Sequence, residues 1–189
     1  MFVNPKELKK LMQEAYKSNN LIVGNTGESY YLQGTYWKVL CKKGFITKTI
    51  LAAIVELAGE LPEEGECFCD GKDGNQMQVN PMKIEKDMDL TKVAVTNMVM
   101  LEHSAARLLQ SNTGKIFLIN NRLVNMVMGH HCDEANGETE PVGPYIVGTS
   151  QAYWKNNVME FITVLRGTDS YERMLEQMEM VDMTEHSIE

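Results

Sequence analysis

Thr-Lys-Thr-Ile-Leu-Ala-Ala-Ile-Val-Glu-Leu-Ala-Gly, residues 47–59, is the stretch of sequence that decides the fold. Its apolar side chains surround most of a helical circumference, which is typical of a helix buried on more than one side. Thr47 suits the N-cap, Gly59 suits a left-handed C-cap residue, and Pro62 prevents the helix from continuing. We therefore expect a buried helix that other elements cover.

The rest of the chain consists mainly of segments with the alternating, β-branched or aromatic pattern of strands. Residues 29–40 suit two strands with a break near Gly34, or one bulged strand. Residues 67–69 and 76–79 suit strands around a hairpin turn, and residues 91–101 suit a central strand. Further strands are expected at 21–23, 115–119, 122–128, 145–147 and 158–165. Residues 104–110 suit a short helix, and residues 129–144 suit a long polar loop.

Amphipathic helices are expected near both ends of the chain. The first begins at the capping residues Asn4-Pro5-Lys6-Glu7 and runs to about Lys17. The last is capped by Thr168 or Asp169 and carries an apolar stripe of Tyr171, Met174, Leu175, Met178 and Val181. The predicted class is α+β, with a largely antiparallel sheet or sheets around the helix at 47–59. The 189 residues form a single domain or two lobes, about 1–90 and 91–189.

The composition is that of a globular protein, at 43% hydrophobic and 23% charged residues. Residues 1–20 lack the apolar core of a signal peptide, and the longest nearly apolar run, 49–58, falls short of the roughly 20 residues that a membrane span needs. Four cysteines are too few for a disulfide scaffold. We therefore expect a cytoplasmic protein that does not interact with membranes.

The net charge of −8 is distributed unevenly along the chain. Residues 1–50 have eight Lys against three Glu, or +5, whereas residues 169–189 have seven acids against Arg173, or −6. An acidic balance disfavours wholesale phosphate binding, which needs a cationic face. It favours a protein partner with a cationic surface.

The acids of the last helix are the main candidates for binding such a partner. Their spacing of i, i+4 and i+7, with one more a turn later, predicts an acidic stripe of Glu172, Glu176, Glu179 and Asp182. Acids in the preceding polar loop would enlarge the surface: Asp133, Glu134, Glu138 and Glu140. The alternative is a docked surface helix whose charges are merely solvated.

A second candidate surface combines aromatic and basic residues that could stack on and neutralise single-stranded nucleic acid. Its members are Tyr36, Trp37, Lys38, Lys42 and Lys43, with Tyr30 and Tyr31 nearby. Because alternate residues of a strand face opposite sides, only some can share a surface. The alternative places Tyr31 or Trp37 in the core, with the lysines solvating an edge.

Cysteine and histidine residues suggest a third candidate, a zinc site. Cys67 and Cys69 could join His131 and Cys132, with His130 also available and Asp133 and Glu134 orienting the ligands. The alternative is two half-buried small side chains and an exposed loop, with Cys41 as a buried strand residue. Apart from zinc we expect no cofactor, and no catalytic residues, since the sequence has no complete catalytic or nucleotide-binding signature.

In size, acidity, its 14 Met residues and lack of catalytic motifs, the chain resembles type II anti-CRISPR proteins of Firmicutes phages and mobile elements. Such proteins bind the Cas9–guide complex and block target DNA, often with acids where phosphates would lie. A second resemblance is to sliding-clamp-like folds. It rests on the helix at 47–59 among antiparallel strands and on the closing Glu160-Phe161-Ile162-Thr163-Val164-Leu165-Arg166.

The leading hypothesis is therefore a non-enzymatic inhibitor of a nucleic-acid-handling host enzyme, with Cas9 as the named target and the host cytoplasm as its location if phage-encoded. The alternative is a clamp-like or single-strand DNA-binding accessory protein of phage DNA metabolism. An exposed stripe of Met and Leu side chains would equally suit a homodimer interface.

Overall fold

The computed structural model describes residues 1–74, 76–80, 90–101, 104–127, 132–168 and 170–184. These residues form four α-helices and eleven strands that pair antiparallel, which confirms the predicted α+β class. The chain divides into two compact units. Unit 1 comprises Met1–Glu85, Met126–Pro141 and Lys155–Ile162, and unit 2 comprises Lys86–Asn125, Val142–Trp154 and Thr163–Glu189. Each unit is thus assembled from three separate segments rather than from one half of the sequence.

Unit 1 is a sheet covered by two helices. Its strand order is β5-β4-β1-β2-β3-β11. The elements are α1 (Pro5–Lys17), β1 (Leu21–Asn25), β2 (Ser29–Gln33), β3 (Trp37–Lys42), α2 (Lys48–Ala58), β4 (Cys67–Asp70), β5 (Met77–Gln78), a 3-10 turn at Glu134–Asn136, and β11 (Met159–Val164), whose last two residues belong to unit 2. The predicted break near Gly34 and the hairpin after Cys69 are both confirmed.

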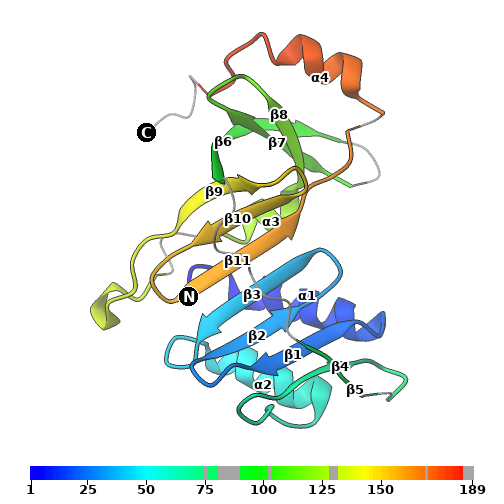
Figure 1. Cartoon of the computed structure of the whole chain (residues 1–189), viewed down its shortest axis with the longest axis vertical. Coiled ribbons are helices and arrows are strands. Elements are labelled where there is room, and N and C mark those ends of the chain that lie inside the picture. Colours follow the sequence, from blue (N-terminus) through cyan, green and yellow to red (C-terminus); the bar gives the residue numbers. More distant parts are fainter. Residues whose placement is uncertain (75, 81–89, 102–103, 128–131, 169, 185–189) are drawn as a thin grey trace. The chain divides into compact units, whose positions relative to one another are not determined.

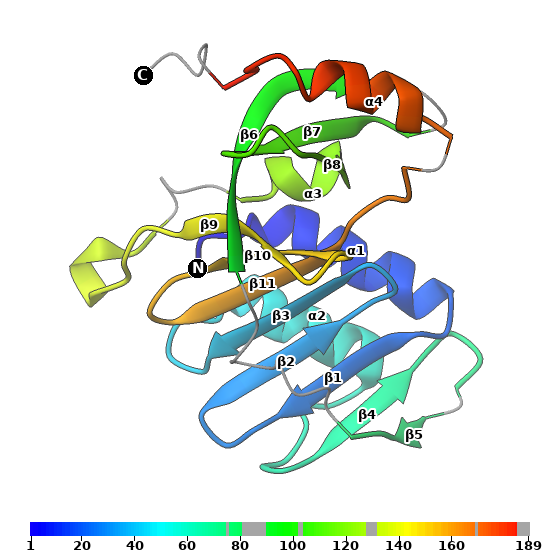
Figure 2. The ribbon, with the colours of Figure 1, turned by 45° about the horizontal axis from the view of Figure 1, so that its top comes forward.

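The core of unit 1 lies between one face of this sheet and the helices. Val23 lies opposite Leu32 and Phe68 in the neighbouring strands, and Leu32 lies opposite Val39. These four side chains form one row, and each is at most 1% exposed. Figures 1 and 2 show α1 and α2 on the same face of strands β1 to β3. The row is therefore the apolar face that the helices cover.

Helix α1 begins as the sequence predicts. The Asn4 side chain accepts hydrogen bonds from the backbone N–H of Lys6 at 3.0 Å and of Glu7 at 3.4 Å. Pro5 occupies the first helical position, where its missing N–H costs nothing. The buried side of the helix consists of Leu8, Leu11, Met12 and Ala15.

Helix α2 lies where the stretch at 47–59 predicts it, but it is buried along one side only. Ile50, Ala53 and Ile54 are buried, whereas Val55 is 44% exposed. This spacing of i, i+3 and i+4 is the pattern of a helix that packs on a single sheet face. Gly59 ends the helix with a positive φ of 85°, as predicted. Thr47 occupies the N-cap position without a side-chain capping hydrogen bond.

Unit 2 has the strand order β10-β9-β6-β7-β8, so the predicted central strand is confirmed as β6. It pairs with β9 through Leu90–Lys92 and with β7 beyond them. The elements are β6 (Leu90–Met100), β7 (Ala106–Ser111), β8 (Ile116–Asn120), α3 (Asn121–Asn125), β9 (Val142–Val147), β10 (Gln151–Lys155, whose last residue belongs to unit 1) and α4 (Glu172–Met178).

Two of the elements predicted in unit 2 are wrong, and the sequence did not predict strand β10. Residues 104–110, expected as a helix, contain strand β7, and β10 lies where no strand was expected. Residues 122–128, expected as a strand, contain helix α3 instead. The Asn120 side chain accepts a hydrogen bond from the Arg122 N–H at 2.9 Å. This local bond starts a helix in place of the expected hairpin turn.

The last helix is shorter than predicted. α4 covers Glu172–Met178 and follows Tyr171, whereas the sequence suggested a cap at Thr168 or Asp169 and a stripe reaching Val181. Asp169 lies outside the described residues. The helix packs on β7 and β8 by inserting Leu175 into a cluster with Leu108, Ile116 and Leu118.

Candidate partner-binding surface and pocket

The four acids predicted to form one helical stripe do not do so. Glu172 and Glu176 lie exposed on α4. Glu179 lies just beyond the helix, where its carboxylate accepts a hydrogen bond from the backbone N–H of Ile116 at 3.1 Å. Asp182 lies further along and accepts hydrogen bonds from the Thr184 hydroxyl and N–H, which lower the pKa of the Asp182 carboxyl. The stripe fails because the helix ends at Met178.

The loop acids expected to enlarge this surface belong to unit 1. Asp133 and Glu134 are exposed at the 3-10 turn. Glu138 is 2% exposed, so it is not a surface acid. It pairs with the amino group of Met1 and accepts hydrogen bonds from the Asp133 N–H at 2.9 Å and the Asn156 side chain at 3.1 Å. Because α4 belongs to unit 2, a surface that joins these acids to Glu172 and Glu176 stays a prediction.

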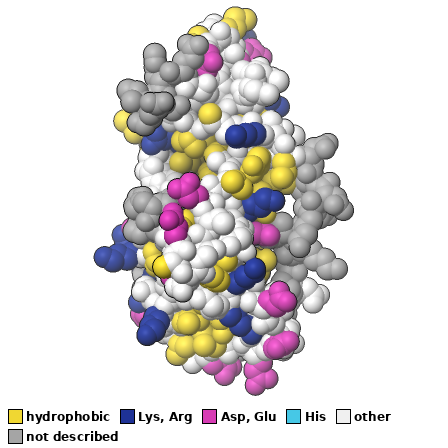
Figure 3. Space-filling model, turned by 90° about the vertical axis from the view of Figure 1, so that its left-hand side faces the viewer, with side chains coloured by type: hydrophobic (Ala, Val, Ile, Leu, Met, Phe, Trp, Pro, Cys, Tyr) yellow, Lys and Arg dark blue, Asp and Glu magenta, His cyan; other side chains and the backbone are white. Residues whose placement is uncertain are grey.

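Charges of both signs are interspersed on the molecular face drawn in Figure 3. Acidic side chains there alternate with Lys and Arg and with hydrophobic side chains, so this face is not a uniform acidic field. The net charge of −8 alone therefore does not show which surface of this protein binds a partner.

The aromatic and basic candidates on β3 and next to it do not all share one face, because successive residues of a strand point to opposite sides of the sheet. Trp37 is 4% exposed and belongs to the core, so it cannot stack on a base. Tyr36 is 64% exposed, and Lys42 is exposed as well. Lys38 is half-buried, which lowers the pKa of its ammonium group. The Lys43 ammonium lies 5.8 Å from the centre of the Tyr30 ring.

The candidate zinc ligands are only partly described. Cys67 and Cys69 lie on β4, and Cys132 precedes the 3-10 turn, whereas His130 and His131 lie outside the described residues. Burial raises the pKa of the thiols of Cys67, Cys69 and Cys132, which favours neutral thiols over the thiolates that bind zinc. Within the described part of the chain, no three Cys, His, Asp or Glu side chains are grouped to hold a metal ion.

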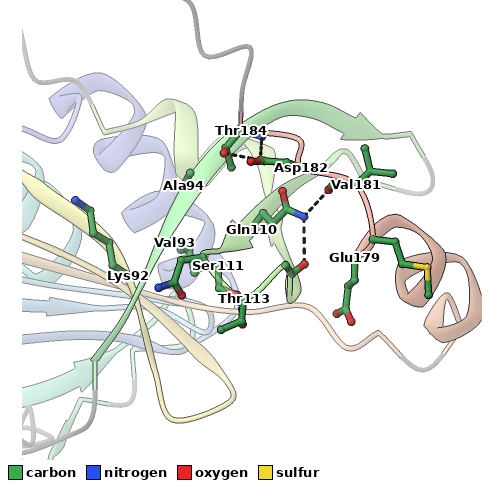
Figure 4. A pocket seen from close by; sticks show the side chains of 13 residues that line it. Lys92, Val93, Ala94, Gln110, Ser111, Thr113, Glu179, Val181, Asp182 and Thr184 are labelled. Carbon is green, nitrogen blue, oxygen red and sulfur yellow. Dashed lines mark hydrogen bonds between the residues drawn. The ribbon is translucent and has the colours of Figure 1, made fainter.

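A pocket in unit 2 was missed by the sequence analysis. It has a volume of about 590 Å³ and lies between β6, the turn after β7, and residues 179–184. Figure 4 shows its side chains, with Ala94 and Gln110 from the strands, Asp182 and Thr184 from the segment after α4, and Lys92 pointing away from them. The one signal for it in the sequence is Gln110, a carboxamide that follows Leu108-Leu109 in the stretch predicted as a helix.

Gln110 is the central polar side chain of this pocket and is 2% exposed. Its amide donates hydrogen bonds to the carbonyl oxygens of Val181 at 2.8 Å and Gly114 at 3.2 Å. Its side-chain oxygen accepts a hydrogen bond from the N–H of Met183 at 2.8 Å. One buried carboxamide therefore fixes the backbone of the segment that follows α4.

Comparisons with known proteins give no family for this chain. No protein-family model matches it, and no curated protein matches it either. Among solved structures it is similar to a DnaN sliding clamp (DNA polymerase III subunit beta) from Bartonella birtlesii bound to griselimycin, with a TM-score of 0.34 and 9% identity. The match covers 90% of this chain and 66% of that one, just under two thirds. A likeness at this TM-score establishes neither fold nor function.

The helices also bear on the question of membranes. None of the helices in the described residues combines the length and the hydropathy that crossing a membrane requires. This finding agrees with the lack of a long apolar run in the sequence.

Proposed function

We propose that this chain is a non-enzymatic inhibitor that binds a cationic surface of a nucleic-acid-handling enzyme, with the Cas9–guide RNA complex as the named target. The observation that supports this proposal is how helix α4 is held: Leu175 anchors it, while Glu172 and Glu176 remain exposed. An enzyme that binds nucleic acid has cationic surfaces for phosphates, which carboxylates complement. If phage-encoded, the inhibitor acts in the cytoplasm of the host cell.

The neighbours of these acids also suit a protein interface. Met174 lies between them in the sequence and is 39% exposed. Methionine is enriched at protein interfaces because its flexible side chain adapts to a partner. A helix already docked on its sheet loses little further entropy when a partner binds its outer side. Residues two apart point to opposite sides of a helix, so Met174 offers an apolar contact on a different side of α4 from Glu172 and Glu176.

The test is cleavage of a matched DNA duplex by Cas9 and guide RNA while the purified protein is titrated in. We expect cleavage to fall to background near one equivalent of protein. The double variant Glu172→Gln/Glu176→Gln should inhibit at least about tenfold more weakly, equivalent to about 1.4 kcal/mol, because both carboxylates lose their cationic partners.

A matched control is the double variant Glu28→Gln/Glu60→Gln, which removes two charges from exposed positions in unit 1. Its inhibition should equal that of the wild type. Equal potency of a folded Glu172→Gln/Glu176→Gln variant would show that these carboxylates of α4 do not bind the target. Full cleavage at a large excess of wild-type protein would remove Cas9 as the target.

The alternative function is a clamp-like or single-strand DNA-binding accessory protein. The exposure of Tyr36, just before β3, and of Lys42, at the opposite end of β3, favours it, although the burial of Trp37 reduces the surface available for stacking. Direct binding of a single-stranded oligonucleotide that weakens steeply with salt would support this alternative. We would then expect Tyr36→Ala to weaken binding by about 1–3 kcal/mol.

A further inference from the structure

Residues 179–184, here named the strap, are held mainly through their backbone. Gln110 binds the carbonyl of Val181 and the N–H of Met183, which are two residues apart. An extended strand offers this same pair of groups to a parallel neighbour. Residues 179–180 form a turn after α4, and for residues 181–183 the Gln110 carboxamide takes the place of a neighbouring strand, as in recognition of an extended peptide by main-chain hydrogen bonds.

The start of the strap also makes a close backbone contact. Gly114, in the turn after β7, has a φ of 86°, and a Cβ atom there would lie 2.5 Å from the carbonyl oxygen of Glu179. Only glycine permits this approach. The Glu179 carboxylate meanwhile binds the N–H of Ile116 on β8. The turn and the strand are thus shaped to receive a peptide backbone.

The side chains of the strap contribute much less than its backbone. Met180 is 90% exposed and Val181 is 58% exposed. Two side chains are exceptions: the Glu179 carboxylate binds the Ile116 N–H, and Met183 is partly buried and packs against the cluster that contains Leu108 and Leu175. The requirements for occupying this site are therefore an extended backbone at the positions of residues 181–183, a flexible apolar side chain at the position of Met183 and a carboxylate at the position of Glu179.

The site has space beyond the strap itself. The pocket of about 590 Å³ lies beside it, and its lining includes Ala94, Ser111, Thr113 and Asp182 (Figure 4). Small and hydroxyl side chains leave room for further residues of a bound peptide. A longer segment than the strap can thus be accommodated.

We propose that the strap occupies, within its own chain, a binding site for an extended peptide, and that a Met-bearing extended segment of a partner protein binds there when the strap is released. The strap is then an intramolecular competitor that lowers the affinity for the partner segment. This inference does not use Glu172 or Glu176, so it stands apart from the proposed inhibition.

The test uses the full chain with the single substitution Met183→Pro, which removes both the N–H that Gln110 binds and the anchoring side chain. The probe is a fluorescein-labelled peptide with the sequence of residues 177–184, Gln-Met-Glu-Met-Val-Asp-Met-Thr. Fluorescence anisotropy should show binding to the variant and at least about tenfold weaker binding to the wild type. A tethered strap competes at a high effective concentration.

Two controls separate backbone recognition from nonspecific adhesion. The same peptide N-methylated at its last Met keeps the side chain but lacks the N–H, and it should bind about fivefold more weakly. The double variant Gln110→Ala/Met183→Pro should lose binding while keeping the far-UV circular dichroism of the single variant. The proposal would be overturned if the peptide did not bind a folded Met183→Pro variant. It would also be overturned if the N-methylated and unmethylated peptides bound equally well.

Discussion

The burial of a single residue, Cys41, makes the stability of this fold depend on pH. It lies fully buried on β3, and burial raises the pKa of its thiol to about 12 from 9.0. The Met1 amino group opposes this rise and Glu138 adds to it. Above pH 9.0 the unfolded chain therefore releases a proton that the folded chain retains.

We predict that this contribution of Cys41 to stability is complete below about pH 9 and is lost as the pH rises toward 12. The loss should approach about 1.4 kcal/mol per pH unit. Urea unfolding of the wild type and of Cys41→Ala across this range measures it, because the stability difference between them should shrink with pH. Val39→Ala is the matched control, a buried substitution on the same strand, and its stability difference from the wild type should not change with pH. If the stability difference between the wild type and Cys41→Ala also stays constant with pH, the prediction is wrong.

The residues that the sequence predicted correctly are those whose roles are local. Asn4 caps α1 through bonds to its own first turn, and Gly59 ends α2 through its positive φ. Glu138 and Gln110 were not recognised, because their partners Met1 and Val181 lie 137 and 71 residues away along the chain. A polar contact between residues far apart in the chain produces no periodic pattern in the sequence.

At the scale of an element, α4 depends on one side chain. Leu175 is 4% exposed in its cluster, whereas the adjacent Met174 is 39% exposed. We predict that Leu175→Ala lowers the free energy of unfolding by about 2–5 kcal/mol and speeds hydrogen exchange of the α4 amides. Met174→Ala, the matched control, should cost less than about 1 kcal/mol. Similar effects of the two substitutions would show that α4 is not anchored by Leu175.

Helices and strands with one solvated face were predicted better than segments buried on both faces. The β-branched residues of β6 identify it as a strand, but β7 contains Leu108 and Leu109 in succession, both fully buried. They pair with Leu118 and Phe117 of β8 and point to opposite faces of the sheet. A strand apolar on both faces has no period-2 pattern, so its sequence cannot be distinguished from that of a short buried helix.

At the scale of the whole molecule, the class followed from the sequence, but the assembly of each unit did not. Unit 1 is completed by segments far from its first 85 residues. The Asn4 N–H donates to the Met126 carbonyl at 2.9 Å, and the Lys42 N–H donates to the Val158 carbonyl at 2.9 Å. Strand β11 thereby covers an edge of β3 that residues 1–85 alone would leave open.

The discontinuity of unit 1 makes a prediction about fragments. Residues 1–85 contain α1, α2 and β1 to β5 but lack β11 and Val127, so the fragment should expose the β3 edge and leave Val3 without its bridge partner. We expect it to aggregate or to unfold without a cooperative thermal transition, because an open edge invites intermolecular pairing. A fragment of residues 1–162 retains all three segments of unit 1 and should keep its near-UV circular dichroism. A cooperative transition in residues 1–85, at the midpoint of the longer fragment, would mean that the distant segments add nothing to this unit.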